Sequence, residues 1–431
     1  MISGFSSVNL VSVAEASTSV SGIITSNTTW IQANSPYNLA GNVLVDLGVT
    51  LTIEPGVTVN IGSYYIMVNG TLRVLGSSLN PVLFNGGQIT ITAAAIGWNN
   101  QTGSGCIIDH AITDGTPITS GISTKITDNT LFSSVATSGS SLVSDNTITG
   151  EVSASGSSMI AKNTIAGRVS VSGSSMLVNN TIVGDAVASD TCVISNNTII
   201  GATSAVGSSV VSNNTIDGGI TAQGNCIISQ NRVSASETAV SVPSWFFQDG
   251  GQPTIENNII ENSTVGISIS ILIRGWVGAN IPLVQNNLIR ENEIGIHYGI
   301  SRQESYAIAP TIIQNNTIIQ NEIGVRFNSA EDCKFLYNNL QGNANYSLYF
   351  LGGANDLNAT YNWWGTTDPQ LISQSIYDYY DDFNLGRVNY APFLNEPAIP
   401  EFPSILSMML TLMPLLAATL LLRKRFLKIT N

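Results

Sequence analysis

One hexapeptide recurs through the middle of the chain and decides its fold. It reads DNTITG at 145–150, KNTIAG at 162–167 and NNTIVG at 179–184, and two further copies, NNTIIG and NNTIDG, follow. The Asn of each copy lies 17 residues after the Asn of the copy before. A repeat this short cannot hold a helical hairpin, which needs about 33 residues. β-branched residues punctuated by Gly and Ser also favour strands over helices.

Each repeat contains three short apolar runs, which in one copy are Thr147–Ile148, Val152–Ala154 and Met159–Ile160. Three strands joined by tight corners make one coil, and stacked coils bring equal positions about 4.8 Å apart. The repeated Ile then forms an aliphatic column inside the stack, comprising Ile148, Ile165, Ile182, Ile199 and Ile216. The pattern predicts an all-β chain folded as a parallel β-helix.

The repeated Asn is predicted to be structural, because stacked amide side chains can bond one another and the corner backbone. The predicted ladder comprises Asn129, Asn146, Asn163, Asn180, Asn197, Asn214, Asn231, Asn257, Asn287, Asn316, Asn338 and Asn362. Gly recurs at two corners of each coil, as at Gly150 and Gly156, where a positive φ is expected. Cys192 and Cys226 lie two coils apart in one column. That separation, about 9.6 Å, is beyond disulfide reach, so both are expected to be small buried residues.

The periodic region sets the expected domain organisation. Residues 42–365 are predicted to form the β-helix, between an N-terminal cap at 17–41 and a C-terminal cap at 366–394. In the C-terminal cap, Asp368 has the side chain of a helix N-cap and Pro369 suits the first helical position. The helix is expected to cover the open end of the solenoid. Its buried face would comprise Leu371, Ile372, Ser375, Ile376 and Tyr379.

Composition excludes several classes of protein. Only 10% of the residues are charged, against about 25% in an average soluble protein, which excludes a coiled coil and a disordered polyampholyte. The net charge of −13 argues against nucleic acid as a partner, because phosphate binding needs a basic patch. All 28 acidic residues lie before Ser404, so the negative charge belongs to the periodic region.

The two ends of the sequence predict export and a membrane anchor. Residues 404–422 are uncharged and apolar, long enough to cross about one hydrocarbon core, and 423–431 carry four basic residues. The positive-inside rule places 423–431 in the cytoplasm and the β-helix outside, joined by a Pro-rich linker at 395–403. Residues 1–16 end in an A-x-A cleavage pattern but lack a basic n-region. A misplaced start codon that truncates a signal peptide is one interpretation, and the absence of a signal is the other.

The C-terminal tail carries a first resemblance. Pro400-Glu401-Phe402-Pro403, then the apolar run and the basic cluster, resembles the PEF-type sorting tails of archaeal surface proteins. The resemblance implies a single-pass cell-surface protein whose anchor an archaeal sortase can replace with a lipid. Ten N-x-S/T sequons, the first at Asn27 and the last at Asn358, fit a glycoprotein.

Other stretches carry a second resemblance. The stretches are LTIEPGVTV at 51–59, NLIRENEIGI at 287–296, NTIIQNEIGV at 316–325 and the segment that begins with YNWWG at 361–365. These stretches resemble right-handed parallel β-helix proteins of the pectate-lyase-like superfamily, including NosD-type and surface β-helix repeats. The resemblance implies a right-handed solenoid with a small C-terminal capping helix, to which the tail adds one transmembrane helix. It says little about function, because the scaffold hosts lyases, hydrolases, adhesins and proteins with no chemistry.

The coils between Asn231 and Asn316 are wider, and their extra residues predict a binding face. Insertions at similar places in successive coils usually lie on one face of a solenoid, and aromatic rings beside Arg are typical of a sugar-binding groove. The alternative is that these loops fold back and pack on themselves. The candidate ligand-binding residues are Trp245, Phe246, Phe247, Trp276, Tyr298, Tyr306, Arg274 and Arg302.

Paired carboxylates raise an enzymatic alternative. Glu293 and Glu322 occupy the same place in adjacent N-E-I-G motifs and are expected to stack about 5 Å apart, the separation found in a retaining glycosidase. The structural interpretation is an exposed corner, because a catalytic acid needs burial in a cleft. Asp378, Asp381 and Asp382 are assigned to the surface of the cap. His110 and His297 are expected to have no ligands beside them, so neither a metal nor a cofactor is predicted.

The sequence therefore favours a non-catalytic, membrane-anchored surface protein that is structural or binds carbohydrate or envelope components. A polysaccharide lyase or glycoside hydrolase that acts at the cell surface is the alternative. A NosD-like copper accessory protein is a third reading, and it would need Met, His or Cys clusters.

Overall fold

The computed structural model describes residues 17–243, 251–273, 281–302 and 308–398. Within these ranges the regular elements are parallel strands, apart from one α-helix, α1 (Pro369–Gln374), and one 3-10 helix, η1 (Gln32–Asn34). The chain divides into two compact units, residues 1–235 and 236–431. The expected bounds of the β-helix, 42–365, stay a prediction.

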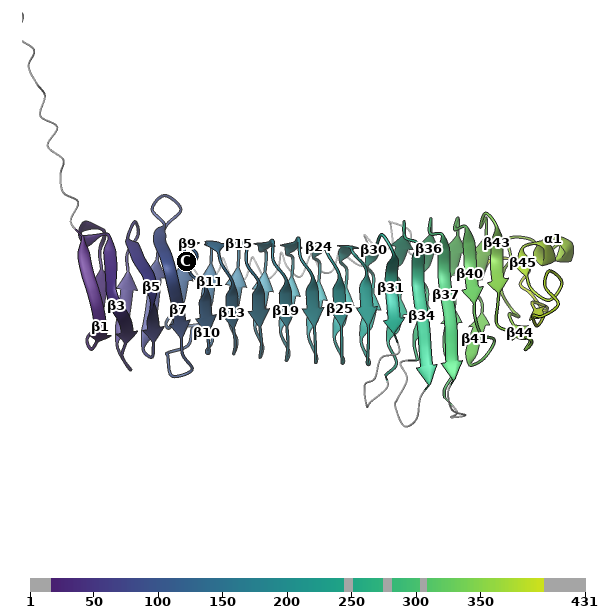
Figure 1. The fold of residues 1–431 in the computed structure, drawn as a ribbon, viewed down its shortest axis with the longest axis horizontal. Helices are drawn as coiled ribbons and strands as arrows, with labels where there is room; N and C mark the ends of the chain where they lie inside the picture. The colour runs from purple at the N-terminus through teal and green to yellow at the C-terminus, as the bar shows by residue number, and fades with distance from the viewer. Residues whose placement is uncertain (1–16, 244–250, 274–280, 303–307, 399–431) are drawn as a thin grey trace, which may run out of the picture. The chain divides into compact units, whose positions relative to one another are not determined.

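Unit 1 contains columns of parallel strands that stack coil upon coil (Figure 1). One column comprises β2 (Thr28–Trp30), β4 (Thr50–Ile53), β6 (Thr71–Leu75), β8 (Ile107–Asp109), β11 (Lys125–Thr127), β14 (Leu142–Ser144), β17 (Met159–Ala161), β20 (Met176–Val178), β23 (Val193–Ser195), β26 (Val210–Ser212) and β29 (Ile227–Ser229). The rest of unit 1 begins with the long strands β1 (Thr18–Ile24), β3 (Tyr37–Val45), β5 (Thr58–Val68) and β7 (Val82–Ile91).

Strand β7 pairs with both β9 and β10, so beyond it the long strands give way to two columns. The first comprises β9 (Ala111–Asp114), β12 (Thr130–Phe132), β15 (Thr147–Ile148), β18 (Thr164–Ile165), β21 (Thr181–Ile182), β24 (Thr198–Ile200), β27 (Thr215–Asp217) and β30 (Arg232–Ser234). The second comprises β10 (Ile118–Ser120), β13 (Val135–Thr137), β16 (Val152–Ala154), β19 (Val169–Val171), β22 (Ala186–Ala188), β25 (Thr203–Ala205) and β28 (Ile220–Ala222). The three strands predicted for each coil are observed as β15, β16 and β17. Strands β1 and β2 lie inside the segment 17–41 that was expected to be a cap. They already pair with β3 and β4, so the coils begin there.

The interior of unit 1 is aliphatic. Ile148, Ile165 and Ile182 pair in register and are fully buried. Cys192 and Cys226 are free, buried thiols, as expected. Burial raises the pKa of the Cys226 thiol to about 11, which keeps it protonated at neutral pH.

The ladder of Asn side chains runs along unit 1 as a chain of hydrogen bonds. At Asn180, Oδ1 accepts from the backbone N–H and from Nδ2 of Asn163 at 2.9 Å each. Its Nδ2 donates to Oδ1 of Asn197 at 3.0 Å and to the carbonyls of Ile160 and Val178. The same side-chain link joins each pair from Asn129 to Asn231. Because these buried amides are fully bonded to protein, their role is structural.

Gly is required at the two corners of the coil for different physical reasons. Gly156 has a φ of 77°, the left-handed conformation expected of it. Gly150, Gly167 and Gly184 do not have positive φ, so the expectation is wrong for these three, whereas Gly201 and Gly218 have φ of 157° and 143°. A Cβ on Gly167 would overlap the carbonyl oxygen of Gly150 in the coil before. Gly is required there because two backbones approach closely.

Unit 2 repeats the coil with longer strands. Its columns are β32 (Thr254–Glu256), β35 (Leu283–Gln285), β38 (Thr311–Gln314) and β41 (Cys333–Leu336); β33 (Ile259–Glu261), β36 (Leu288–Arg290), β39 (Thr317–Ile319) and β42 (Asn339–Gln341); and β31 (Thr238–Pro243), β34 (Val265–Ile273), β37 (Ile294–Arg302), β40 (Ile323–Phe327), β43 (Tyr346–Phe350) and β45 (Ile376–Tyr377). A short pair, β44 (Leu357–Asn358) and β46 (Val388–Asn389), lies beside the C-terminal cap.

The Asn ladder of unit 2 starts at Asn258 and not at Asn257. Asn258 donates from Nδ2 to Oδ1 of Asn287 at 3.0 Å, and the ladder continues through Asn316, Asn338 and Asn362. The prediction of Asn257 is wrong because that residue has a φ of 57° and occupies the left-handed position before the ladder residue.

A second ladder, which the sequence analysis missed, joins Asn292, Asn321 and Asn343. Nδ2 of Asn292 donates to Oδ1 of Asn321 at 3.0 Å, and Nδ2 of Asn321 donates to Oδ1 of Asn343 at 3.1 Å. The wider coils of unit 2 therefore have a hydrogen-bonded amide column at two corners.

The C-terminal cap contains the predicted helix start but a shorter helix. The side chain of Asp368 accepts from the backbone N–H of Gln370, with Pro369 at the first position. The helix ends at Gln374, and Ile376 belongs to β45, which pairs with β43. Leu371 is exposed, so the predicted apolar face over five residues is wrong. The strand ladder reaches the cap and replaces the second half of the expected helix.

The segment after the cap returns along the coils. The N–H of Leu394 donates to the carbonyl of Asn362 at 3.0 Å, and Nδ2 of Asn339 donates to the carbonyl of Ala398 at 2.8 Å. The linker predicted from residue 395 is therefore bonded to unit 2 as far as Ala398. Residues 1–16, 404–422 and 423–431 lie outside the described residues. Among the residues described, no helix has the length and apolar character needed to cross a membrane.

Candidate functional site

A row of outward-facing side chains crosses unit 2 from strand to strand. Parallel pairing aligns Ser268 of β34 with His297 of β37, His297 with Arg326 of β40, Arg326 with Tyr349 of β43, and Tyr349 with Tyr377 of β45. All five side chains are partly exposed, since they alternate with buried neighbours along each strand. We call this set the outward row.

Three tyrosine rings cluster at one end of the outward row. The rings of Tyr349 and Tyr377 stack with centroids 4.4 Å apart and planes 23° apart. The ring of Tyr346 lies 5.3 Å from Tyr349 and 5.6 Å from Tyr377. Desolvation by neighbouring groups, together with Tyr349 and Asp382, raises the pKa of Tyr377. The phenol of Tyr377 is therefore a neutral hydrogen-bonding group at physiological pH.

His297 and Arg326 form the polar middle of the outward row. Desolvation lowers the pKa of His297, and the Arg326 charge lowers it further, so the imidazole is neutral at pH 7. Its Nε2 is buried and has no hydrogen-bond partner in the described residues. Nε of Arg326 donates to Oδ1 of Asn328 at 3.3 Å, which orients the guanidinium along the face.

Tyr298 does not belong to this exposed face, which corrects the sequence prediction. Its side chain is fully buried in register with Phe327, and the two ring centroids are 5.5 Å apart. Its hydroxyl contacts the carbonyls of Glu331 and Asp332 at 2.8 and 3.0 Å. The alternation of the strand explains the error, because Tyr298 has the same parity as the buried Ile296.

The other predicted ligand-binding residues lie at or beyond the ends of three neighbouring strands. Strands β31, β34 and β37 pair in register up to Pro243, Ile273 and Arg302. Arg302 thus ends β37, on the sheet that carries the outward row. Trp245, Phe246, Phe247, Arg274, Trp276 and Tyr306 lie outside the described residues, so their part in binding stays a prediction.

The paired carboxylates Glu293 and Glu322 are both exposed. The backbone N–H of Glu322 donates to the carbonyl of Asn292, and that of Glu293 to the carbonyl of Ser263. The two residues therefore occupy a corner of successive coils, as the N-E-I-G motif implies. Such an exposed corner lacks the burial that raises the pKa of a catalytic acid.

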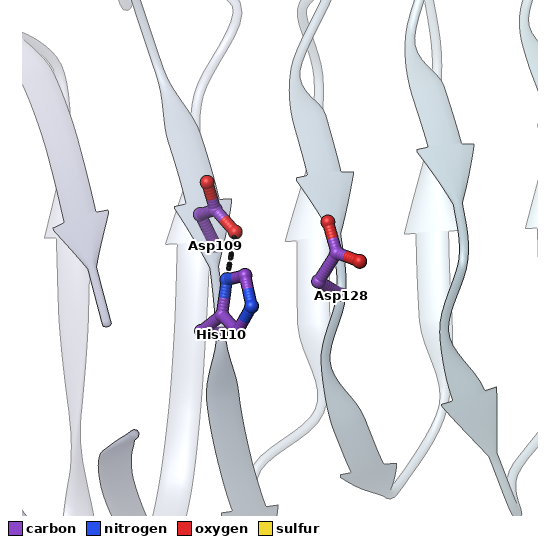
Figure 2. A group of neighbouring side chains, drawn as sticks. All are labelled: Asp109, His110 and Asp128. Atoms are coloured by element: carbon purple, nitrogen blue, oxygen red, sulfur yellow. Dashed lines mark hydrogen bonds and ion pairs between the residues drawn. The ribbon is translucent and has the colours of Figure 1, made fainter. Parts of the chain in front are cut away.

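A second group of polar side chains lies in unit 1, where Asp109, His110 and Asp128 approach one another (Figure 2). Nδ1 of His110 and Oδ1 of Asp109 are 2.6 Å apart. The hydroxyl of Thr127 donates to Oδ2 of Asp128 at 2.9 Å. His110 and Asp128 both have positive φ, 49° and 56°. The expectation that His110 has nothing beside it is therefore wrong, and the spacing of about one coil between His110 and Asp128 was the available signal.

The carboxylates of the cap accept hydrogen bonds from backbone N–H groups. Oδ2 of Asp378 accepts from Val388 N–H at 2.8 Å and Oδ1 from Tyr380 N–H at 3.0 Å. Oδ2 of Asp381 accepts from Asp378 N–H. Oδ1 of Asp382 accepts from the backbone N–H and from Nδ2 of Asn384. These three residues shape the cap.

Comparison with known proteins gives one family match. Residues 178–364 match the family described as "Periplasmic copper-binding protein (NosD)", which is less than half of the chain. Among solved structures, the chain is similar to the PL6 family polysaccharide lyase Pedsa3628 from Pseudopedobacter saltans, at 12% identity and a TM-score of 0.27. That alignment covers 82% of this chain and 90% of the lyase. A likeness this low supports no inference about the site. No curated protein matches the sequence.

Proposed function

We propose that this protein is a non-catalytic surface protein that binds carbohydrate or another envelope polymer along the outward row of unit 2. The observation that carries the proposal is the strand register, which places Ser268, His297, Arg326, Tyr349 and Tyr377 in one column. Rungs about 4.8 Å apart present tyrosine rings at one end and the guanidinium of Arg326 in the middle. A saccharide has apolar ring faces and hydroxyl groups, so it complements both.

The surface location is proposed from the sequence. The apolar run 404–422 and the basic residues after it are the expected anchor. The PEF-type tail suggests an archaeal sortase as a partner. With this anchor, unit 2 is the part of the β-helix nearest the membrane along the chain.

The non-catalytic assignment rests on the character of the described face. Its outward row has no carboxylate, and the only pair expected to act as acid and nucleophile, Glu293 and Glu322, lies on an exposed corner. A glycosidase acid needs an apolar or enclosed environment to hold its proton near neutral pH. These observations favour binding over hydrolysis.

Affinity electrophoresis of the full chain in detergent against a panel of soluble polysaccharides tests the proposal. We expect at least one polysaccharide to retard the protein. Tyr349→Ala should weaken that affinity about tenfold, because a well-stacked aromatic contact contributes up to about 1.4 kcal/mol. Arg168→Gln is the matched control, since it removes an exposed Arg from unit 1, and it should bind like the wild type. Equal retardation of wild type and Tyr349→Ala contradicts the assignment of the row.

The lyase or hydrolase alternative makes an opposite prediction on the same panel. An enzyme would release reducing or unsaturated ends from the polysaccharide that it binds, and Glu322→Gln would abolish that release. Glu322→Gln should leave binding intact if the outward row is the site. Product formation that depends on Glu322 would reject the non-catalytic proposal.

A copper accessory role is the second candidate, favoured by the NosD family match. In the described residues the donors would come from Asp109, His110 and Asp128, which lie outside the matched segment. One imidazole and two carboxylates form a poor copper site, because copper sites use more nitrogen or sulfur donors. Equilibrium dialysis of the full chain against Cu(II) tests this role. Stoichiometric retention that His110→Gln abolishes would support it, and absence of retention would reject it.

A further inference from the structure

A hollow of about 410 Å³ lies in the C-terminal cap, away from the side chains of the outward row. Three separate pieces of chain line it: Ser373 from α1, Tyr380 from the turn after β45, and Arg387 with Asn389 and Tyr390 around β46. Its size lies in the range of small-molecule sites, about 300–1,000 Å³.

Arg387 is held in a fixed position in this hollow. Its guanidinium lies over the ring of Tyr379 at 5.1 Å and over the ring of Tyr380 at 5.9 Å. Its backbone N–H donates to Oδ1 of Asp356 at 2.8 Å, and its carbonyl accepts from Leu357 N–H at 2.9 Å. Cation–π contacts orient the guanidinium plane without using its N–H groups.

The side chain of Arg387 has no ion-pair partner among the residues that the structure describes. The nearby carboxylates are used elsewhere: Asp378 is buried and accepts two backbone N–H groups, and Asp382 accepts from Asn384. The five N–H donors of Arg387 form the fork that matches a carboxylate in two parallel hydrogen bonds.

The groups around Arg387 suit a sugar. The ring of Tyr380 is 69% exposed and offers an apolar surface for a sugar ring. Ser373 and Asn389 are exposed and supply a hydroxyl and an amide that can bond sugar hydroxyls. An inorganic anion would need only the Arg, and a neutral sugar would need only the ring and the amide.

We infer that the cap hollow binds one acidic sugar residue, with its carboxylate on Arg387 and its ring against Tyr380. This inference rests on the proposed carbohydrate-binding function and names an anionic saccharide as one ligand class. The cap site and the outward row use different side chains, so each can fail alone. A polymer that reaches both sites would gain avidity without any new contact.

Isothermal titration of the full chain in detergent tests the inference. The probes are tetrasaccharides of hyaluronan and of polygalacturonate, each compared with its carboxyl-reduced, neutral counterpart. We expect at least one acidic probe to bind about tenfold more tightly than its neutral form, and the advantage to shrink as salt screens the charge. Failure of both acidic probes to bind, or equal binding of acidic and neutral forms, overturns the inference.

Substitutions distinguish the Arg387 contact from the Tyr380 contact, and the cap hollow from the outward row. Arg387→Gln should lose about tenfold in affinity for the acidic probe and little for the neutral one. Tyr380→Phe should bind like the wild type, whereas Tyr380→Ser should weaken both probes. Arg168→Gln in unit 1 controls for the loss of one positive charge, and thermal unfolding checks that each variant is folded. If Arg387→Gln binds the acidic probe like the wild type while Tyr349→Ala loses the panel ligand, the cap site is wrong and the proposed function stands.

Discussion

The coils of unit 1 between Asn129 and Asn231 and the coils of unit 2 share one plan and differ in length. In unit 1 the ladder Asn recurs every 17 residues, whereas in unit 2 the ladder intervals are 29, 29, 22 and 24 residues. A short coil is nearly all strand and corner, so its outward positions hold small residues such as Thr164 and Ser153. A longer coil has strands of nine residues that present His297 and its neighbours outward. The outward row therefore lies where the coils of unit 2 are wide.

Breaking the amide ladder of unit 1 should give the largest effect. Asn180→Ala removes the acceptor of the Asn163 backbone N–H, one of the three acceptors of Asn163 Nδ2, and a donor to the carbonyl of Ile160. Each unsatisfied buried group costs about 1–3 kcal/mol, so we expect a loss of about 4 kcal/mol in the free energy of unfolding. Urea unfolding measures it. Thr181→Ala, on the exposed face of the same coil, should change stability by less than about 0.5 kcal/mol. Equal effects of the two substitutions would show that the ladder is not a main source of stability.

Adding one methyl group should cost most where the backbones of two successive coils approach closely. A Cβ on Gly167 would overlap backbone atoms of Gly150, so Gly167→Ala should destabilise unit 1 by about 3 kcal/mol. A Cβ on Gly299 in unit 2 would meet only Cβ of Asn328, at 3.6 Å, an ordinary contact. Gly299→Ala should therefore be tolerated within about 1 kcal/mol. Thermal unfolding of both variants measures the difference, and a more harmful Gly299→Ala would reverse the comparison.

The smallest expected effect is a pH dependence confined to unit 2. Desolvation and Arg326 lower the pKa of His297, so the unfolded chain binds more protons than the folded chain at mildly acidic pH. Folded stability should therefore fall as pH drops through the ordinary range of histidine, near 6.5, and His297→Gln should flatten that slope. Urea unfolding between about pH 5 and about pH 8 measures it. An unchanged slope in the variant would mean that His297 titrates alike in both states.

The repeat made the fold of unit 1 predictable, because identical residues must stack on identical residues. It located β15, β16 and β17, the Ile column and the buried Cys192. The prediction of the ladder failed where two adjacent Asn residues were both candidates for the ladder position. Asn257 and Asn258 are adjacent, and only the backbone conformation decides which one turns inward. The helix after Asp368 was overextended because pairing of Ile376 with Leu348 outweighs local helical preference.

The candidate site was harder to predict, because periodicity determines which residues face inward and says little about outward neighbours. Tyr298 was misplaced although the alternation of β37 pointed it inward. Arg326, Tyr349 and Tyr377 were missed because they are spread over coils of unequal length, and only the strand register brings them together. Arg387 was missed for the same reason, since its partners Tyr379 and Tyr380 approach through the turn of the cap.

The central claim is that unit 2 binds a polymer along its outward row without cleaving it. The most direct test measures binding and product release together, on one polysaccharide, with the full chain in detergent and with its Tyr349→Ala and Arg168→Gln variants. The account predicts saturable binding by the wild type and by Arg168→Gln, about tenfold weaker binding by Tyr349→Ala, and no release of new chain ends by any of them. Equal binding by all three proteins, or release of chain ends by the wild type, would contradict it.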